Sequence, residues 1–156
     1  MPDRNRGTVQ DPEIESRRAV MALCAAATEA ELAEAVTACG EPEAEDIRLP
    51  EVGLVMATGR IGGDGRPFNL GEVSVTRAAV RLADGRTGFA YHLGRDRRRA
   101  RVAAILDALW QGEGDRRGVE AALAGIARRT AEATVAQARR TAATRVDFLT
   151  LARGED

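Results

Sequence analysis

The chain has 156 residues, of which 44% are hydrophobic and 30% charged, a composition typical of a soluble globular protein with one core. Its net charge is −1, so no overall positive field draws it to nucleic acid or to an anionic membrane. All 23 basic residues are arginine, which excludes a lysine-bearing phosphate loop and Schiff-base chemistry on a lysine.

The N-terminal residues 1–10 are predicted to be a flexible tail, and residues 11–156 a single domain. The tail has no apolar core, so it does not resemble a secretory signal. The longest apolar run, residues 19–27, is too short to span a bilayer. Cys24 and Cys39 stand in no metal-binding or CxxC spacing and are predicted to be small buried hydrophobes. These features favour a cytoplasmic protein that does not enter the membrane.

Two helices are predicted at the start of the domain. Asp11 followed by Pro12 is typical of an N-cap and a proline in the first turn, and this helix continues to Ala27. Thr28 and Glu31 have the spacing of a capping box for a second helix that ends at Gly40. The pair is predicted to form an αα-hairpin.

Short segments rich in β-formers follow from residue 45, separated by glycine turns. Asp84-Gly85 is a strong hairpin signal. Before this turn, the apolar residues at 73 and 75 are out of phase with those at 80 and 82, which predicts a bulge within 76–79. After it, alternation predicts four residues on the core side and His92 on the surface side. The predicted core residues of this strand are Thr87, Phe89, Tyr91 and Leu93.

Two further helices are predicted in the second half. An apolar stripe at i, i+3, i+4, i+7 and i+8 marks the first, and its members are Val102, Ile105, Leu106, Leu109 and Trp110. Residues 111–118, "QGEGDRRG", are predicted to be a loop. A long helix over 119–142 has an apolar face that gives way to alanine, so it is predicted to lean on another element or another chain. The segment "TRVDFLTLARG" is predicted to be a strand.

The predicted fold class is therefore α+β. A small, mainly antiparallel sheet is covered by helices, with the αα-hairpin before it and the long helix and final strand after it.

The residue types for autonomous catalysis are scarce. His92 is the only histidine and is predicted to be an ordinary surface residue, and no GxSxG motif is present. A metal site rich in histidine or cysteine is excluded within one chain. No catalytic residue, cofactor-binding residue or metal ligand is therefore predicted.

Glycine and arginine patterns suggest contacts rather than catalysis. The segment "GRIGGDGRPF" is predicted to connect a hairpin, with positive φ at Gly62, Gly63 or Gly65; alternatively, its amides and Arg60 or Arg66 approach an anion or a partner backbone. Arg77 and Arg81 share one face of a strand. They are either solvated charges, paired with carboxylates under a helix, or part of a polar interface between chains.

Five arginines crowd the start of the helix that carries the apolar stripe, in "GRDRRRAR". Asp96 is the predicted N-cap. Counting back along the stripe, Arg95, Arg98 and Arg99 point toward the sheet edge, and Arg97 and Arg101 point away. A solvated face is the preferred interpretation, because net charge and the lack of interleaved aromatics oppose nucleic-acid binding.

The combination of "RIGGDGRPF", "TRAAVRLADG", "GRD" and "RVDF" resembles the PhnG family, the small subunit of the bacterial carbon–phosphorus lyase core complex, from Gly53 onward. The resemblance implies a role in forming α-D-ribose 1-methylphosphonate 5-triphosphate from ATP and methylphosphonate, with release of adenine. It implies partners as well, chiefly PhnI and also PhnH and PhnJ, and no catalytic residue in this chain. The candidate interface or anion-contacting residues that match the family pattern are Arg60, Arg77, Arg81, Arg95, Asp96, Arg145 and Asp147.

Two other functions stay open at this point. One is a stand-alone transferase that holds a phosphate or a nucleotide through Arg60, Arg77 and Arg95. The other is a nucleic-acid-binding module, which rests only on the arginine run and would show steep salt dependence.

Overall fold

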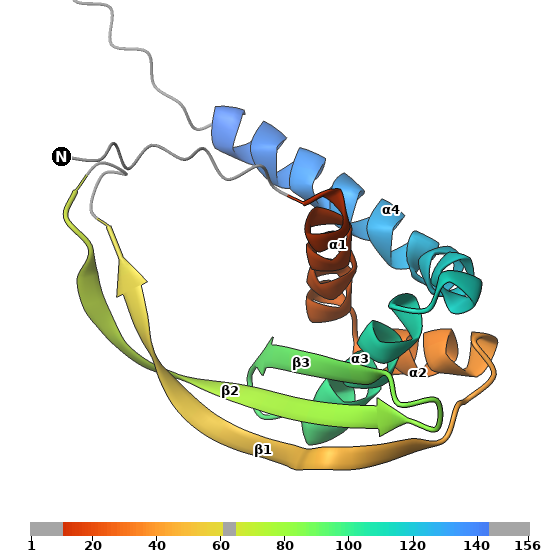
Figure 1. Cartoon of the computed structure of the whole chain (residues 1–156). Helices are drawn as coiled ribbons and strands as arrows, with labels where there is room; N and C mark the ends of the chain where they lie inside the picture. Colours follow the sequence, from red (N-terminus) through yellow and green to blue (C-terminus); the bar gives the residue numbers. More distant parts are fainter. Residues whose placement is uncertain (1–10, 61–64, 144–156) are drawn as a thin grey trace, which may run out of the picture.

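A computed structural model describes residues 11–60 and 65–143 of the chain. The elements, in chain order, are α1 (Pro12–Ala26), α2 (Glu29–Ala38), β1 (Ala44–Gly59), β2 (Phe68–Leu82), β3 (Thr87–Leu93), α3 (Arg97–Trp110) and α4 (Glu113–Ala143). The three strands form one antiparallel sheet in the order β1-β2-β3, and the helices gather on one side of it (Figure 1). The predicted α+β class is confirmed.

The first two helices begin where their caps predict. The Asp11 carboxylate accepts a hydrogen bond from the Glu13 N–H at 3.0 Å, and Pro12 opens α1. Thr28 and Glu31 form the predicted capping box at the start of α2. Gly40 follows α2 with φ of +87°, the left-handed conformation that ends many helices. Each of the two helices packs on both α3 and α4.

The core is built around α3, which is enclosed by the sheet and the other helices. Nine of its residues are buried, among them the predicted Ile105, Leu106, Leu109 and Trp110. Its contact with β3 is unusually close at Gly88, where an added Cβ would lie 1.9 Å from the Ala104 carbonyl oxygen. The helix therefore rests directly on the strand backbone.

The predicted bulge within residues 76–79 is wrong. β2 pairs with β3 without a break from Val75 to Arg81, and the extra residues lie in β1 between Asp46 and Glu51, opposite this part of β2. A second irregularity lies near the end of the ribbon, where Leu70 of β2 is the extra residue between the Ala57 and Thr58 pairs. Val75 of one phase and Val80 of the other are both buried, and Val73 is half-buried, because β2 is the central strand and its second face is screened by side chains of both neighbours.

The predicted orientation of β3 is also wrong. Gly88, Ala90 and His92 face α3 and are buried, whereas the larger side chains of Phe89, Tyr91 and Leu93 are exposed, Leu93 to 73%. The close approach of an alanine-rich helix requires small residues on the strand beneath it. Alternation identified the two faces of the strand correctly but assigned the core to the wrong one.

The last helix starts earlier than predicted. Residues 113–118 belong to α4 rather than to a loop, and only Gln111 and Gly112 separate it from α3. Val119, Leu123 and Ile126 are buried as predicted. Every side chain of residues 131–143 is exposed, and this part of α4 extends away from the sheet (Figure 1). The strand predicted for "TRVDFLTLARG" lies outside the described residues.

Candidate functional site

The single histidine is buried, which corrects the prediction that it lies on the surface. His92 is 2% exposed, and neither ring nitrogen has a hydrogen-bond partner among the described residues. Burial lowers its pKa to about 4, with a further lowering from Arg99 and an opposing effect from Asp96. A neutral imidazole that substrate cannot reach is a packing residue, and it is unsuited to acid–base catalysis.

The cysteines are equally unsuited to nucleophilic chemistry. Cys24 is fully buried, and burial raises the pKa of its thiol to about 12. Cys39 is half-buried at the end of α2 and packs against the core. Within the ranges 11–60 and 65–143, no three histidine, cysteine or acidic side chains come together as ligands for a metal ion.

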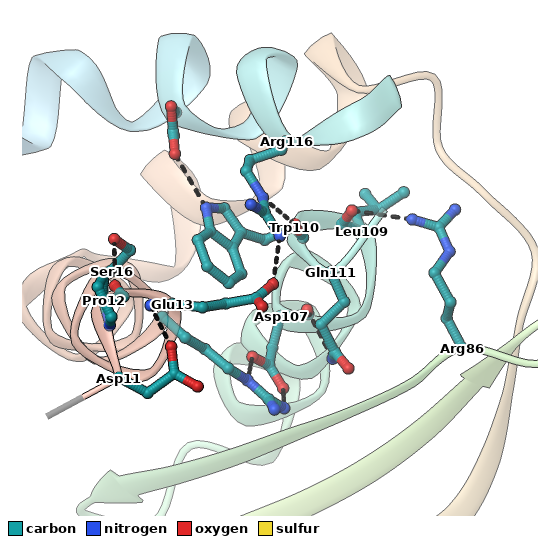
Figure 2. Close-up of polar contacts among 12 residues, drawn as sticks. Asp11, Pro12, Glu13, Ser16, Arg86, Asp107, Leu109, Trp110, Gln111 and Arg116 are labelled. Atoms are coloured by element: carbon teal, nitrogen blue, oxygen red, sulfur yellow. Dashed lines mark hydrogen bonds and ion pairs between the residues drawn. The ribbon is translucent and has the colours of Figure 1, made fainter. Parts of the chain in front are cut away.

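An ion pair between the buried Asp107 and the half-buried Arg17 joins α1 to α3, and Asp107 also contacts β3. The Asp107 carboxylate, 1% exposed, accepts hydrogen bonds from Arg17 Nε at 2.8 Å and Nη2 at 2.7 Å. Its Oδ2 also accepts the Phe89 N–H at 2.9 Å, and its position on α3 is seen in Figure 2. Sequence reasoning assigned Asp107 no contact, because its partners lie 90 and 18 positions away. This carboxylate is fully occupied within the fold and is thus a structural group.

Two arginines organise the junction between α3 and α4 (Figure 2). Arg86 donates to the Leu109 carbonyl at 2.9 Å and to Asp115 at 2.6 Å, so its charge lies at the C-terminal end of α3 where a cation is favourable. Arg116 stacks over the Trp110 ring at 4.2 Å and donates to Glu13 at 2.7 Å. Both side chains therefore stabilise the packing between elements of this chain rather than bind a ligand.

The arginine run at the start of α3 is divided between internal contacts and solvent. Asp96 is the N-cap, as predicted, and accepts the Arg99 N–H at 2.9 Å. Arg99 reaches the Ala25 carbonyl of α1. Arg101 was predicted to point away, but it bridges to β1 through Asp46 at 2.7 Å. Arg98, in contrast, is mostly exposed beside Glu29.

The arginines of the family pattern do not converge on one site. Arg77 and Arg81 lie on the sheet face that no helix covers, and Arg77 donates to Glu51 at 2.6 Å. Arg95 is exposed, and among the described residues its side chain donates a hydrogen bond only to the Ser74 hydroxyl, at 3.2 Å. Arg60 follows the last residue of β1, Gly59, which pairs with Phe68 of β2. Phe68 is six positions from Ser74 along β2, so Arg60 and the Ser74 contact of Arg95 are about 20 Å apart. Arg145 and Asp147 lie outside the described residues, as do Gly62 and Gly63.

Exposed apolar side chains lie on three surfaces of the described chain, two of which carry several large residues and the third only one. We call the uncovered side of the sheet the open face; it carries Phe89, Tyr91 and Leu93. The arm is the β1–β2 ribbon that continues past β3 in Figure 1, and it exposes Leu54, Met56, Phe68 and Leu70. The distal helix is residues 131–143 of α4, with Val135 half exposed. A two-stranded ribbon of this kind is marginally stable alone, so the arm suggests a partner surface.

Two comparisons with known proteins found similar sequences. The family model for "Phosphonate metabolism protein PhnG" matches residues 15–154. A protein of Rhizobium meliloti (strain 1021), named α-D-ribose 1-methylphosphonate 5-triphosphate synthase subunit PhnG, is 49% identical over 150 residues, which cover 96% of each chain. No helix in the described part of the chain is long and apolar enough to cross a membrane.

Proposed function

The chain belongs to the PhnG family, and from this premise we propose that it is a non-catalytic subunit of an α-D-ribose 1-methylphosphonate 5-triphosphate synthase. The reaction joins ATP and methylphosphonate and releases adenine. The chain contributes structure to the complex, and the catalytic groups are supplied by its partners, chiefly PhnI, with PhnH and PhnJ in the same assembly.

The observation that carries this proposal is the contrast between the chain's chemistry and its surface. His92 and Cys24 are buried inside the fold, and the Asp107 carboxylate already accepts hydrogen bonds from Arg17 and from the Phe89 N–H. At the same time, the open face and the arm leave several large apolar side chains in water, and the distal helix leaves one, Val135. Such surfaces cost free energy in a monomer and are typical of subunits that assemble with others.

The alternative of a stand-alone transferase is less well supported. It requires Arg60, Arg77 and Arg95 to hold one ligand, yet the strand register separates Arg60 from the Ser74 contact of Arg95 by about 20 Å. Arg77 is already bonded to Glu51, which Arg48 also contacts at 2.5 Å. A single phosphate group therefore cannot bridge the three as they stand.

The test is co-expression of the chain with the other subunits of the synthase from the same organism, followed by purification through a tag on this chain. Met56→Ser on the arm is compared with Glu72→Ser, because Met56 and Glu72 are paired on the same face. Burying a methionine stabilises by about 1.5–3 kcal/mol, so Met56→Ser is expected to weaken retention of the partners roughly tenfold or more. Glu72→Ser is expected to retain them.

Both variants are expected to keep the melting temperature of the chain, since both side chains are exposed. If the tagged wild-type chain retains no other subunit, the proposed function is wrong. If the two variants behave alike, the arm is not the contact.

A further inference from the structure

The outer edge of β3 is only partly satisfied within the chain. In an antiparallel strand the N–H and C=O of one residue point to the same side, and alternate residues point to opposite sides. Gly94 donates to Ser74 on β2, so the even-numbered residues face β2 and the odd-numbered ones face outward. Consistent with this, Gln111 donates to the Thr87 carbonyl at 2.8 Å, and the Phe89 N–H donates to Asp107.

Beyond Phe89 this internal satisfaction stops. Neither the Tyr91 N–H nor the Leu93 N–H has a hydrogen-bond partner among the described residues, and the Tyr91 carbonyl faces the same way. The side chains of both residues are exposed, Tyr91 to 54% and Leu93 to 73%. An edge that is blocked at one end and open at the other has room for a short strand of about three residues.

The surface next to this edge favours an apolar strand with an acidic residue. A hollow of about 350 Å³ lies against Phe89, Tyr91 and Met21 and extends to Arg77 and Arg48. On the open face three arginines, Arg48, Arg77 and Arg81, stand opposite or beside two glutamates, Glu45 and Glu51. The excess is positive, so a carboxylate is attracted and a second copy of the same face is not.

We propose that the Phe89–Leu93 edge of β3 receives an extended segment from another subunit of the synthase, which adds a fourth strand to the sheet. Its apolar side chains alternate over Phe89 and Tyr91, and a carboxylate among them faces Arg48 and Arg77, whose two charges share the single Glu51 carboxylate. A helix does not fit the same edge, because its backbone groups are bonded internally and leave the Tyr91 and Leu93 N–H groups unpaired. This proposal rests on the proposed function.

The decisive comparison is Leu93→Pro against Leu93→Ala in the co-expressed complex. Both remove the same exposed side chain, but only proline removes the outward N–H, and proline is tolerated where the N–H of an edge strand faces outward. We expect Leu93→Ala to lower the affinity for the partner less than Leu93→Pro, with at least a further tenfold loss for proline. Both variants are expected to melt at the wild-type temperature.

Hydrogen exchange gives a second measurement that needs no variant. The Tyr91 and Leu93 amides of the wild-type chain are expected to exchange at least 100-fold more slowly in the complex than in the free chain. Equal retention of the proline and alanine variants, or unchanged exchange of both amides in an intact complex, overturns the added strand while leaving the proposed function in place.

Two other results are also informative. A homodimer of the free chain that Leu93→Pro dissociates assigns the edge to a second copy and overturns the partner proposed here. A wild-type chain that retains no other subunit overturns the proposed function and this inference with it.

Discussion

Replacing Gly88 with alanine tests the close packing of α3 on β3 that sets the orientation of the whole sheet. The added Cβ would lie 1.9 Å from the Ala104 oxygen, 2.5 Å from the Ala108 nitrogen and 2.8 Å from the Ala108 Cβ. Ordinary contact begins at 3.4 Å, so α3 must move away from the strand by about 1.5 Å, the difference between 3.4 and 1.9 Å. Two of these atoms are backbone, so no side-chain rotation relieves the clash.

The expected cost is at the upper end of the range for overpacking, about 3 kcal/mol of unfolding free energy or more. A helix shifted by this amount also loosens the hydrogen bond from the Phe89 N–H to Asp107 on the same helix. Trp110 is the only tryptophan and is 1% exposed, so its fluorescence reports urea unfolding of the core directly.

Gly53→Ala in β1 is the matched control. An added Cβ there meets no heavy atom within 4 Å, and its φ is not in the left-handed region, so its unfolding free energy is expected to stay within about 0.5 kcal/mol of wild type. If Gly88→Ala is as stable as Gly53→Ala, then α3 does not rest on the β3 backbone and the assignment of the buried face of β3 is wrong.

Three further predictions concern the buried and exposed charges. His92→Leu is expected to be neutral or slightly stabilising at pH 7, because the imidazole forms no hydrogen bond there. The pKa of His92 in the folded protein is about 4, below the ordinary 6.5, so the unfolded state binds a proton first as the pH falls. The wild type is therefore expected to lose up to about 3 kcal/mol of unfolding free energy between pH 6.5 and 4 through this residue, and His92→Leu is expected not to. Urea unfolding measured across this pH range compares the two. Arg17→Ala leaves the buried Asp107 carboxylate with the Phe89 N–H alone and is expected to cost about 1.5–3 kcal/mol in the same assay, since Arg17 itself is 37% exposed; an unchanged stability would show that Asp107 does not depend on Arg17. Arg95→Ala is expected to lower recovery of the complex in a pull-down more than Arg98→Ala, since Arg95 contacts only a hydroxyl within the described chain and is free to pair with a carboxylate of a partner; equal recovery contradicts this.

The parts of the fold that could be predicted from the sequence are those encoded by neighbouring residues. The caps at Asp11, Thr28 and Asp96 and the turn at Asp84-Gly85 act over two to four positions, and each lies where it was predicted. The glycine-rich segment likewise connects the β1–β2 hairpin. The stripe on α3 was also predictable, because a helix enclosed by the fold needs apolar residues at helical spacing.

The orientation of β3 could not be predicted in this way. Alternation shows that Phe89 and Tyr91 share one face and Ala90 and His92 the other, but size alone favours the larger residues as the core. The deciding fact is the approach of α3 to Gly88, which joins residues 16 or more positions apart in the chain. In a single sequence, the pattern of large apolar side chains on an exposed face does not differ from the pattern of side chains in the core.

The surface charges show the same limit. Arg97 and Arg101 were both predicted to point away from the sheet edge, yet Arg101 bridges to Asp46 because β1 passes beside that turn of α3. Likewise, nothing local to Asp107 predicts a bidentate contact with Arg17. Contacts of this kind depend on the packing of whole elements, which periodicity within a single element does not encode.

The most direct test of the account is adenine release from ATP and methylphosphonate, measured for three samples: the purified chain alone, the complex purified through this chain, and the other subunits expressed without it. We predict adenine only from the complex that contains this chain, and none from the chain alone. Turnover by the isolated chain, with other subunits excluded by mass spectrometry, would contradict a non-catalytic role. Full turnover by the other subunits without it would contradict its place in the synthase.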